Sequence, residues 1–162
     1  RIVLPGVGAF AHCMGSLSDI DGMIGALSAR VLDGGVPFLG ICVGMQLLAD
    51  AGVEHGKTAG LGWIGGTVRA IAPAPAIKIP HMGWNDVTLG APHPVLEGGE
   101  AYFLHSYHFD TAMPAHVLAT THHGSALTAA IGRDNILGVQ KKKKKSQSYG
   151  IHTLKRFLEW MP

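Results

Sequence analysis

The sequence has few cysteines, few charges and no long uninterrupted hydrophobic run. Its two cysteines, Cys13 and Cys42, are too few for a disulfide framework among 162 residues and favour a reducing compartment, so we expect a cytoplasmic protein. Apolar residues make up 47% and charged residues 15%, which excludes an intrinsically disordered chain. The apolar stretch at 36–49 is shorter than the roughly 18 residues of a membrane-spanning helix. We therefore expect a globular chain with no membrane segment.

Broad positive charge is also missing, although the formal net charge is +2. Five of the 13 basic residues form one run at 141–145, and without those lysines the net charge falls to −3. A protein that binds nucleic acid needs basic residues spread over a whole face, so we expect no nucleic-acid partner. The ten histidines show no zinc-ligand spacing with a third partner, so we predict no metal. We expect His81 and His105 to form structural or interface hydrogen bonds.

The first third of the chain alternates strand and helix patterns. Residues 1–4 and the continuous apolar run 36–41 are typical of strands, the second one buried on both faces. Between them, apolar residues recur at steps of three and four from Met14 to Val31, which predicts one helix ending at Gly34-Gly35. A further helix begins over 43–49. This order predicts a parallel sheet in an α/β fold.

The rest of the chain is richer in strands. The patterns predict strands at 66–71, 77–80, 84–87, 101–107, 117–121, 127–131 and 136–140, with a turn at 133–135. A closing helix is expected to bury one face, made of Ile151, Leu154, Phe157, Leu158 and Met161. We therefore predict a single α/β domain over residues 1–162, with a mixed or two-part sheet.

The most informative stretch is Gly40-Ile41-Cys42-Val43-Gly44. A nucleophile framed by glycines, between a buried strand and a helix, is typical of a nucleophile elbow. There the helix N-terminus favours the thiolate, and the amide of Val43 is placed to stabilise an oxyanion. The alternative is that Cys42 is a small buried hydrophobe. Cys13 has no glycine frame, so we expect it to pack.

The stretch 40–48, Gly-Ile-Cys-Val-Gly-Met-Gln-Leu-Leu, resembles the nucleophile segment of class I, triad-type glutamine amidotransferases. Further stretches resemble the glutaminase subunits of imidazole glycerol phosphate synthases: 5–10, 60–64, 105–107, 134–140 and above all 78–85, with Pro-His-Met-Gly-Trp-Asn. The resemblance runs over nearly the whole chain. That family begins with a strand and a helix before the segment that matches residue 1, so we expect an N-terminally truncated chain.

The resemblance implies a mostly parallel central sheet flanked by helices, with additional antiparallel strands. It implies that Cys42 hydrolyses glutamine through a thioester and that ammonia passes to a partner (β/α)8-barrel cyclase in a heterodimer. No cofactor is implied. The site residues that it implies are Val7, Gly8 and Val43 as oxyanion donors, Gly6, Gly8, Gln46, Ser106 and Tyr107 for glutamine, and Trp84, Asn85 and Lys145 for the partner.

The chain departs from this family directly after Gln140. The family has Phe-His-Pro-Glu there, and this chain has four lysines at 141–144. Lys142 therefore stands in the position of the histidine base and Lys144 in that of the glutamate that orients it. Without both groups, we expect activity to be lower by several orders of magnitude. We also expect the lysine run to be disordered or to form a loop turned to solvent.

Several alternatives stay open at this stage. The lysines could be an engineered, degenerate or recording anomaly in an intact amidotransferase, or the mark of a non-catalytic subunit that docks on the cyclase. Lys142 could also act as an unusual base, because neighbouring like charges lower a lysine pKa. Another class I amidotransferase subunit, serving a different synthase, is the remaining possibility.

Overall fold

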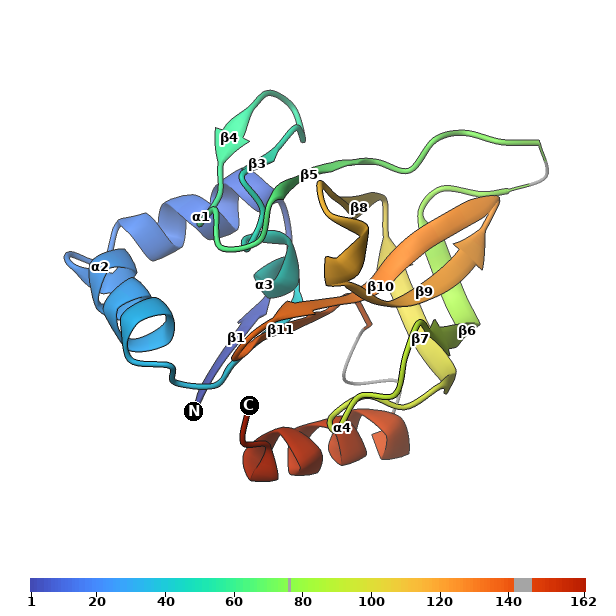
Figure 1. The fold of residues 1–162 in the computed structure, drawn as a ribbon. Coiled ribbons are helices and arrows are strands. Elements are labelled where there is room, and N and C mark those ends of the chain that lie inside the picture. The colour runs from blue at the N-terminus through green and yellow to red at the C-terminus, as the bar shows by residue number, and fades with distance from the viewer. Residues whose placement is uncertain (76, 142–146) are drawn as a thin grey trace.

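The computed structural model describes residues 1–75, 77–141 and 147–162, with only the backbone given for 147–149. Residues 142–146 are therefore not described. They include Lys142 and Lys144, which stand in the positions of the family's histidine and glutamate, and Lys145, which is predicted to contact the partner. In the described part, seven strands form one sheet in the order β1-β2-β11-β10-β9-β6-β7, and four form another in the order β4-β3-β5-β8 (Figure 1). Over the same ranges, no helix combines the length and the apolar character that crossing a membrane requires.

The first elements confirm the alternation of strands and helices. They are β1 (Ile2–Gly6), α1 (Phe10–Ser18), α2 (Met23–Ser28), the π-helical turn η1 (Ala29–Asp33), β2 (Phe38–Cys42) and α3 (Val43–Gln46). Strand β2 pairs in parallel with β1 on one side and with β11 on the other. Every residue of β2 is buried, as the continuous apolar run predicts.

The single helix predicted from Met14 to Val31 is wrong. Helix α1 ends at Ser18, and α2 begins after Gly22, whose φ of 70° is left-handed and interrupts the helix. The helix predicted over 43–49 is also too long, since α3 ends at Gln46. The carbonyls of Leu47, Leu48 and Ala49 accept hydrogen bonds from backbone amides of residues 61–64, so the chain turns there.

The later elements are mostly strands, as predicted. They are β3 (Ala51–Gly52), β4 (Thr58–Ala59), β5 (Gly66–Ala70), β6 (His81–Leu89), β7 (Gly99–His105), β8 (Tyr107–Thr111), the 3-10 turn η2 (Pro114–His116), β9 (Val117–His123), β10 (Ser125–Arg133) and β11 (Ile136–Val139). No strand forms at 77–80, where Pro80 lacks an amide donor. The strand predicted over 101–107 is divided at Ser106, so that β7 joins the larger sheet and β8 the smaller one.

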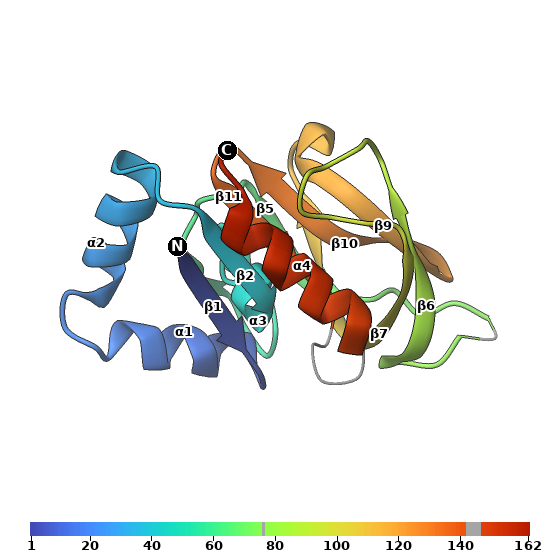
Figure 2. The same ribbon diagram turned by 90° about the horizontal axis from the view of Figure 1, so that it is seen from below.

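Helix α4 (Gln147–Glu159) lies across the face of the larger sheet opposite α3 (Figures 1 and 2). Its buried side chains include Thr153 and Phe157. The predicted apolar face is wrong at three positions, since Ile151, Leu158 and Met161 are 51%, 62% and 87% exposed. Thr153 faces the sheet four residues before Phe157. Because Thr153 is polar, the spacing of apolar residues did not predict its burial.

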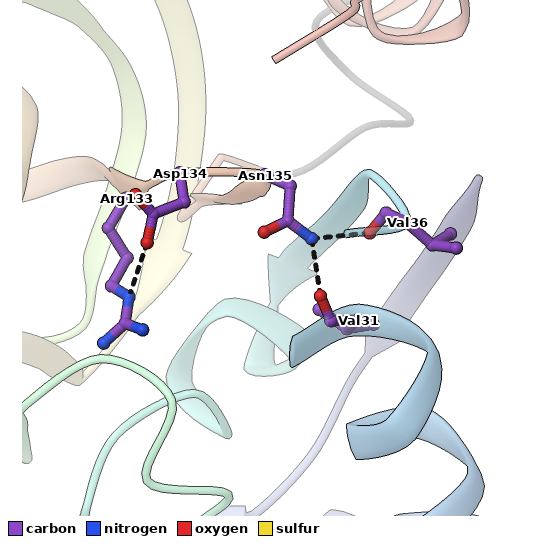
Figure 3. A network of polar contacts seen from close by, with 5 residues as sticks. All are labelled: Val31, Val36, Arg133, Asp134 and Asn135. Carbon is purple, nitrogen blue, oxygen red and sulfur yellow. Dashed lines mark hydrogen bonds and ion pairs between the residues drawn. The ribbon is translucent and has the colours of Figure 1, made fainter. Parts of the chain in front are cut away.

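Asn135 joins the β10–β11 turn to the segment that leads into β2 (Figure 3). Its Nδ2 donates to the carbonyl oxygens of Val31 and Val36, both at 2.8 Å. The turn itself was predicted, and Asp134 has the left-handed backbone expected there, with a φ of 49°. This cross-link fixes the chain directly before the strand that carries Cys42.

Candidate active site

Cys42 lies at a sharp bend between β2 and α3. Its φ of 57° and ψ of −116° are a rare conformation for a residue other than glycine. A Cβ on Gly40 would come within 2.5 Å of the Gly44 carbonyl oxygen, and a Cβ on Gly44 would overlap the carbonyl of Leu4. Both glycines are therefore required by close backbone packing, as the elbow prediction demands.

Cys42 forms part of the wall of a cavity of about 320 Å³. The cavity brings together seven predicted site residues: Val7, Gly8, Cys42, Val43, Gln46, Ser106 and Tyr107. These residues come from β2, α3, the chain after β1 and the junction of β7 with β8. The predicted proximity of the Pro5–Gly8 bend and the thiol is therefore confirmed, while the chemical role of each residue stays a prediction.

Gly6, at the end of β1, is not among the residues that line this cavity. It pairs with Cys42 in the parallel register. A Cβ there would lie 2.8 Å from the Gly44 nitrogen and 2.9 Å from the Val43 Cβ, so Gly6 permits β1 to pack against α3. Its predicted part in glutamine binding stays a prediction.

A row of amides connects the thiol to the cavity wall. Gln140 donates from Nε2 to the Cys42 Sγ over 3.9 Å, and its Oε1 accepts from the Gln46 Nε2 at 3.0 Å. Gln46 Nε2 also lies 3.2 Å from the carbonyl oxygen of Tyr107. Gln140 was missed as a site residue, although it stands directly before the position where the family motif departs.

The cavity wall also contains residues that the sequence analysis did not place there: Glu54, Pro80, Leu104 and His105. The carboxylate of Glu54 accepts a hydrogen bond of 2.8 Å from the backbone amide of Phe10 at the start of α1. His105 Nδ1 lies 2.8 Å from the Tyr107 carbonyl oxygen, and its Nε2 lies 3.1 Å from Nδ1 of His81. The structural role expected for His81 and His105 is therefore confirmed.

Burial lowers the pKa of His81 and of His105 to about 4, with a smaller contribution from the neighbouring His123 to each. Both imidazoles are consequently neutral at neutral pH. Across the described ranges, no group of three or more His, Cys, Asp or Glu side chains is arranged to hold a metal ion.

Cys13 is half-buried beside the core, as predicted for a packing residue. Its Sγ lies 3.2 Å from the Val7 carbonyl oxygen, to which the thiol donates. Burial raises the pKa of this thiol, which disfavours the reactive thiolate.

The predicted partner face lies on β6. Trp84 is 55% exposed and packs edge-on against Tyr102 of β7. Asn85 Nδ2 donates to the carbonyl oxygen of His122 at 2.7 Å and lies 3.1 Å from Nε2 of His81. The third predicted partner residue, Lys145, is among the residues that are not described.

Comparison with known proteins gives consistent results. Residues 1–141 match the family described as glutamine amidotransferase class-I. The chain is 58% identical over 164 residues to a protein of Zymomonas mobilis named imidazole glycerol phosphate synthase subunit HisH, with 100% of this chain and 77% of that protein covered. It is 56% identical over 168 residues to the protein of the same name from Rhodospirillum rubrum, covering 100% and 78%.

Solved structures agree on the fold. A crystal structure of a glutamine amidotransferase matches with a TM-score of 0.69 and 21% identity, covering 97% of this chain and 76% of the other. PurLQS from Thermotoga maritima matches with a TM-score of 0.66 and 14% identity, covering 97% and 78%.

Proposed function

Because the chain belongs to the class I glutamine amidotransferase family, among the imidazole glycerol phosphate synthase subunits named HisH, we propose that its cavity binds glutamine and that Cys42 attacks the side-chain amide. The observation that carries the proposal is the position of the Cys42 thiol, at a glycine-framed bend that faces the cavity. The two thiols suit a reducing cytoplasm.

The proposed reaction has two steps. The Cys42 sulfur forms a bond to the amide carbon, the C–N bond breaks, and the nitrogen leaves as ammonia after gaining a proton. Water then attacks the thioester carbon, which returns the thiol and gives glutamate. The backbone amides of Val43 and Gly8 are our candidates for the donors that stabilise the oxyanion in both steps. Gln46 and Tyr107 are our candidates for orienting the glutamine.

The partner in this proposal is a (β/α)8-barrel cyclase that receives the ammonia. Curated relatives are named as subunits of imidazole glycerol phosphate synthase, which supports a role in histidine biosynthesis. The exposed Trp84 on β6 supports a docking face there.

We further propose that this polypeptide is catalytically impaired. Lys142 and Lys144 occupy the family positions of the histidine and the glutamate. A general base is needed to deacylate the thioester, whereas the fraction of Cys42 present as thiolate can attack without it. Loss of such partners in comparable sites costs several orders of magnitude in rate.

The test is ammonia release from glutamine with the cyclase present. We expect almost no turnover by the chain as it stands, and a large gain when Lys141–Lys144 are replaced by Phe-His-Pro-Glu. Cys42→Ala in the restored chain is the control and should abolish the gain. Equal turnover before and after restoration would overturn the impairment. A restored chain that releases no ammonia would overturn the glutaminase proposal.

A further inference from the structure

A continuous chain of hydrogen bonds runs from strand β6 into the wall of the cavity. It starts at Asn85, whose Nδ2 lies 3.1 Å from His81 Nε2. It continues from His81 Nδ1 to His105 Nε2 at 3.1 Å, and from His105 Nδ1 to the Tyr107 carbonyl oxygen at 2.8 Å. The register of β6 and β7 makes this possible, because it pairs His81 directly with His105.

The protons of this chain have one consistent arrangement. The amide of Asn85 is oriented by two further contacts, since Nδ2 donates to the His122 carbonyl and Oδ1 accepts from the Asp86 amide. An amide NH2 group only donates, so His81 Nε2 must accept. His81 then carries its proton on Nδ1 and donates to His105 Nε2. His105 consequently carries its proton on Nδ1 and donates to the Tyr107 carbonyl oxygen.

The carbonyl oxygen of Tyr107 connects the two histidines to the candidate active site. It accepts from the Gln46 Nε2, which also donates to Gln140, the residue whose amide contacts the Cys42 sulfur. Gln46 and Tyr107 are the residues proposed to orient glutamine. A change in the direction of the Tyr107 carbonyl therefore changes the orientation of the Gln46 amide as well as that of Tyr107.

We propose that His81 and His105 are positioning residues of the glutaminase site, which hold the Tyr107 carbonyl and, through it, the Gln46 amide in the orientation that binds glutamine. The inference rests on the proposed function. Neither histidine is assigned a proton transfer. Each ring keeps one tautomer, so that the hydrogen bonds are donated in one direction, from Asn85 through His81 and His105 to the Tyr107 carbonyl oxygen.

The surroundings of the pair support this role. His81 is stacked between Phe103, at a ring distance of 4.8 Å, and His123, at 4.2 Å. An N–H···N bond requires one neutral acceptor nitrogen, and burial keeps the pKa of both rings at about 4, with His123 acting on both and His108 on His105. The pair therefore keeps its neutral form at neutral pH.

The experiment measures inactivation of Cys42 by the chloromethyl ketone analogue of glutamine, because this reading does not need the missing base. The inhibition constant KI reports binding of the glutamine moiety, and the rate of alkylation by iodoacetamide reports the thiol alone. His105→Leu removes the donor to Tyr107, and we expect KI to rise about tenfold, as for the loss of one hydrogen bond in a buried site. The iodoacetamide rate should change by less than about twofold.

Two variants keep the test decisive if His105→Leu fails to fold. His105→Asn places an amide donor near the position of Nδ1 and should keep KI within about twofold of the parent. His81→Phe retains the ring stacking but removes the donor to His105, and KI should rise about threefold. His152→Asn, at an exposed histidine of α4, is the matched control and should change nothing.

Ring nitrogen NMR of the unaltered chain tests the direction of the hydrogen bonds on which the inference depends. Both His81 and His105 should show a proton on Nδ1. A proton on Nε2 of His105, or an equal KI in all variants while the parent is labelled, would overturn the inference alone. No labelling of the parent by the chloromethyl ketone would overturn the proposed function, and the inference with it.

Discussion

Gly44 leaves less room for a Cβ than Gly6 or Gly40, the other glycines packed at the candidate nucleophile, and this sets a prediction at the scale of one residue. In Gly44→Ala the added methyl group would overlap the carbonyl of Leu4 in β1. We expect the free energy of unfolding to fall by about 2–4 kcal/mol and alkylation of Cys42 to slow, because β1 and α3 must separate. Chemical denaturation and iodoacetamide kinetics measure the two effects.

Gly15 is the matched control for this substitution. It lies in α1, and a Cβ there meets no atom within 4 Å. Gly15→Ala should raise the free energy of unfolding by about 0.5–1 kcal/mol, because alanine loses less backbone entropy in a helix. A Gly44→Ala chain as stable as the parent would contradict the close approach at the elbow.

At this scale, the sequence predicted the features of the site that are formed by residues adjacent in the chain. The glycines around Cys42 are adjacent in sequence, so the elbow was predictable. His105 and Gln140 were not assigned to the site, because their partners are distant in sequence: Gln140 contacts Cys42 98 positions away, and His105 bonds His81 24 positions away. Only the strand register brings these pairs together.

At the scale of the element, Lys141 is an unfavourable residue between β11 and α4. It is 6% exposed, and its Nζ donates to the Thr153 Oγ1 at 2.6 Å. The expectation that the whole lysine run faces solvent is therefore wrong at Lys141. Burial lowers the pKa of this lysine from 10.5 to about 7, although the charge of Glu97 acts in the opposite direction.

This pKa shift predicts how stability depends on pH. Between pH 7 and pH 10.5, the unfolded chain binds a proton at Lys141 that the folded chain largely lacks, so this group makes the protein more stable as pH rises across that range. Lys141→Met should stabilise the chain by about 1–3 kcal/mol at pH 7, with an advantage that shrinks towards pH 10. Denaturation of both proteins at several pH values measures it.

Lys155→Met, at an exposed position of α4, is the control for the loss of one lysine and should change the free energy of unfolding at pH 7 by less than about 0.5 kcal/mol. An advantage of Lys141→Met that grows from pH 7 to pH 10 would contradict the predicted sign.

Asn135 sets a second prediction for an element, the segment between η1 and β2. Asn135→Ala removes two hydrogen bonds to backbone carbonyls and should cost about 1–3 kcal/mol of stability (Figure 3). Arg133→Ala removes only an exposed ion pair to Asp134 in the same turn and should cost less than about 1 kcal/mol. Equal losses in the two denaturation curves would show that Asn135 does not anchor β2.

At the scale of the whole molecule, the cavity depends on two sheets. Cys42 and Gln140 belong to the end of the larger sheet near β2 and β11, whereas Tyr107 begins β8 of the smaller sheet. The alternation of patterns in the first third predicted the parallel pairing of β1 with β2. The division at Ser106 was not predictable, because one run of strand residues gives no sign of where a chain leaves one sheet for another.

The arrangement of the whole molecule also gives the prediction for the partner. Trp84 is exposed on β6, and large aromatic residues often contribute much of the binding energy at protein interfaces. We expect Trp84→Ala to weaken binding of the barrel cyclase at least about tenfold, with little change in the stability of the free chain. Leu158→Ala is the control, because Leu158 is exposed to a similar extent but lies on α4. Calorimetric titration measures both affinities, and equal affinities would remove Trp84 from the docking face.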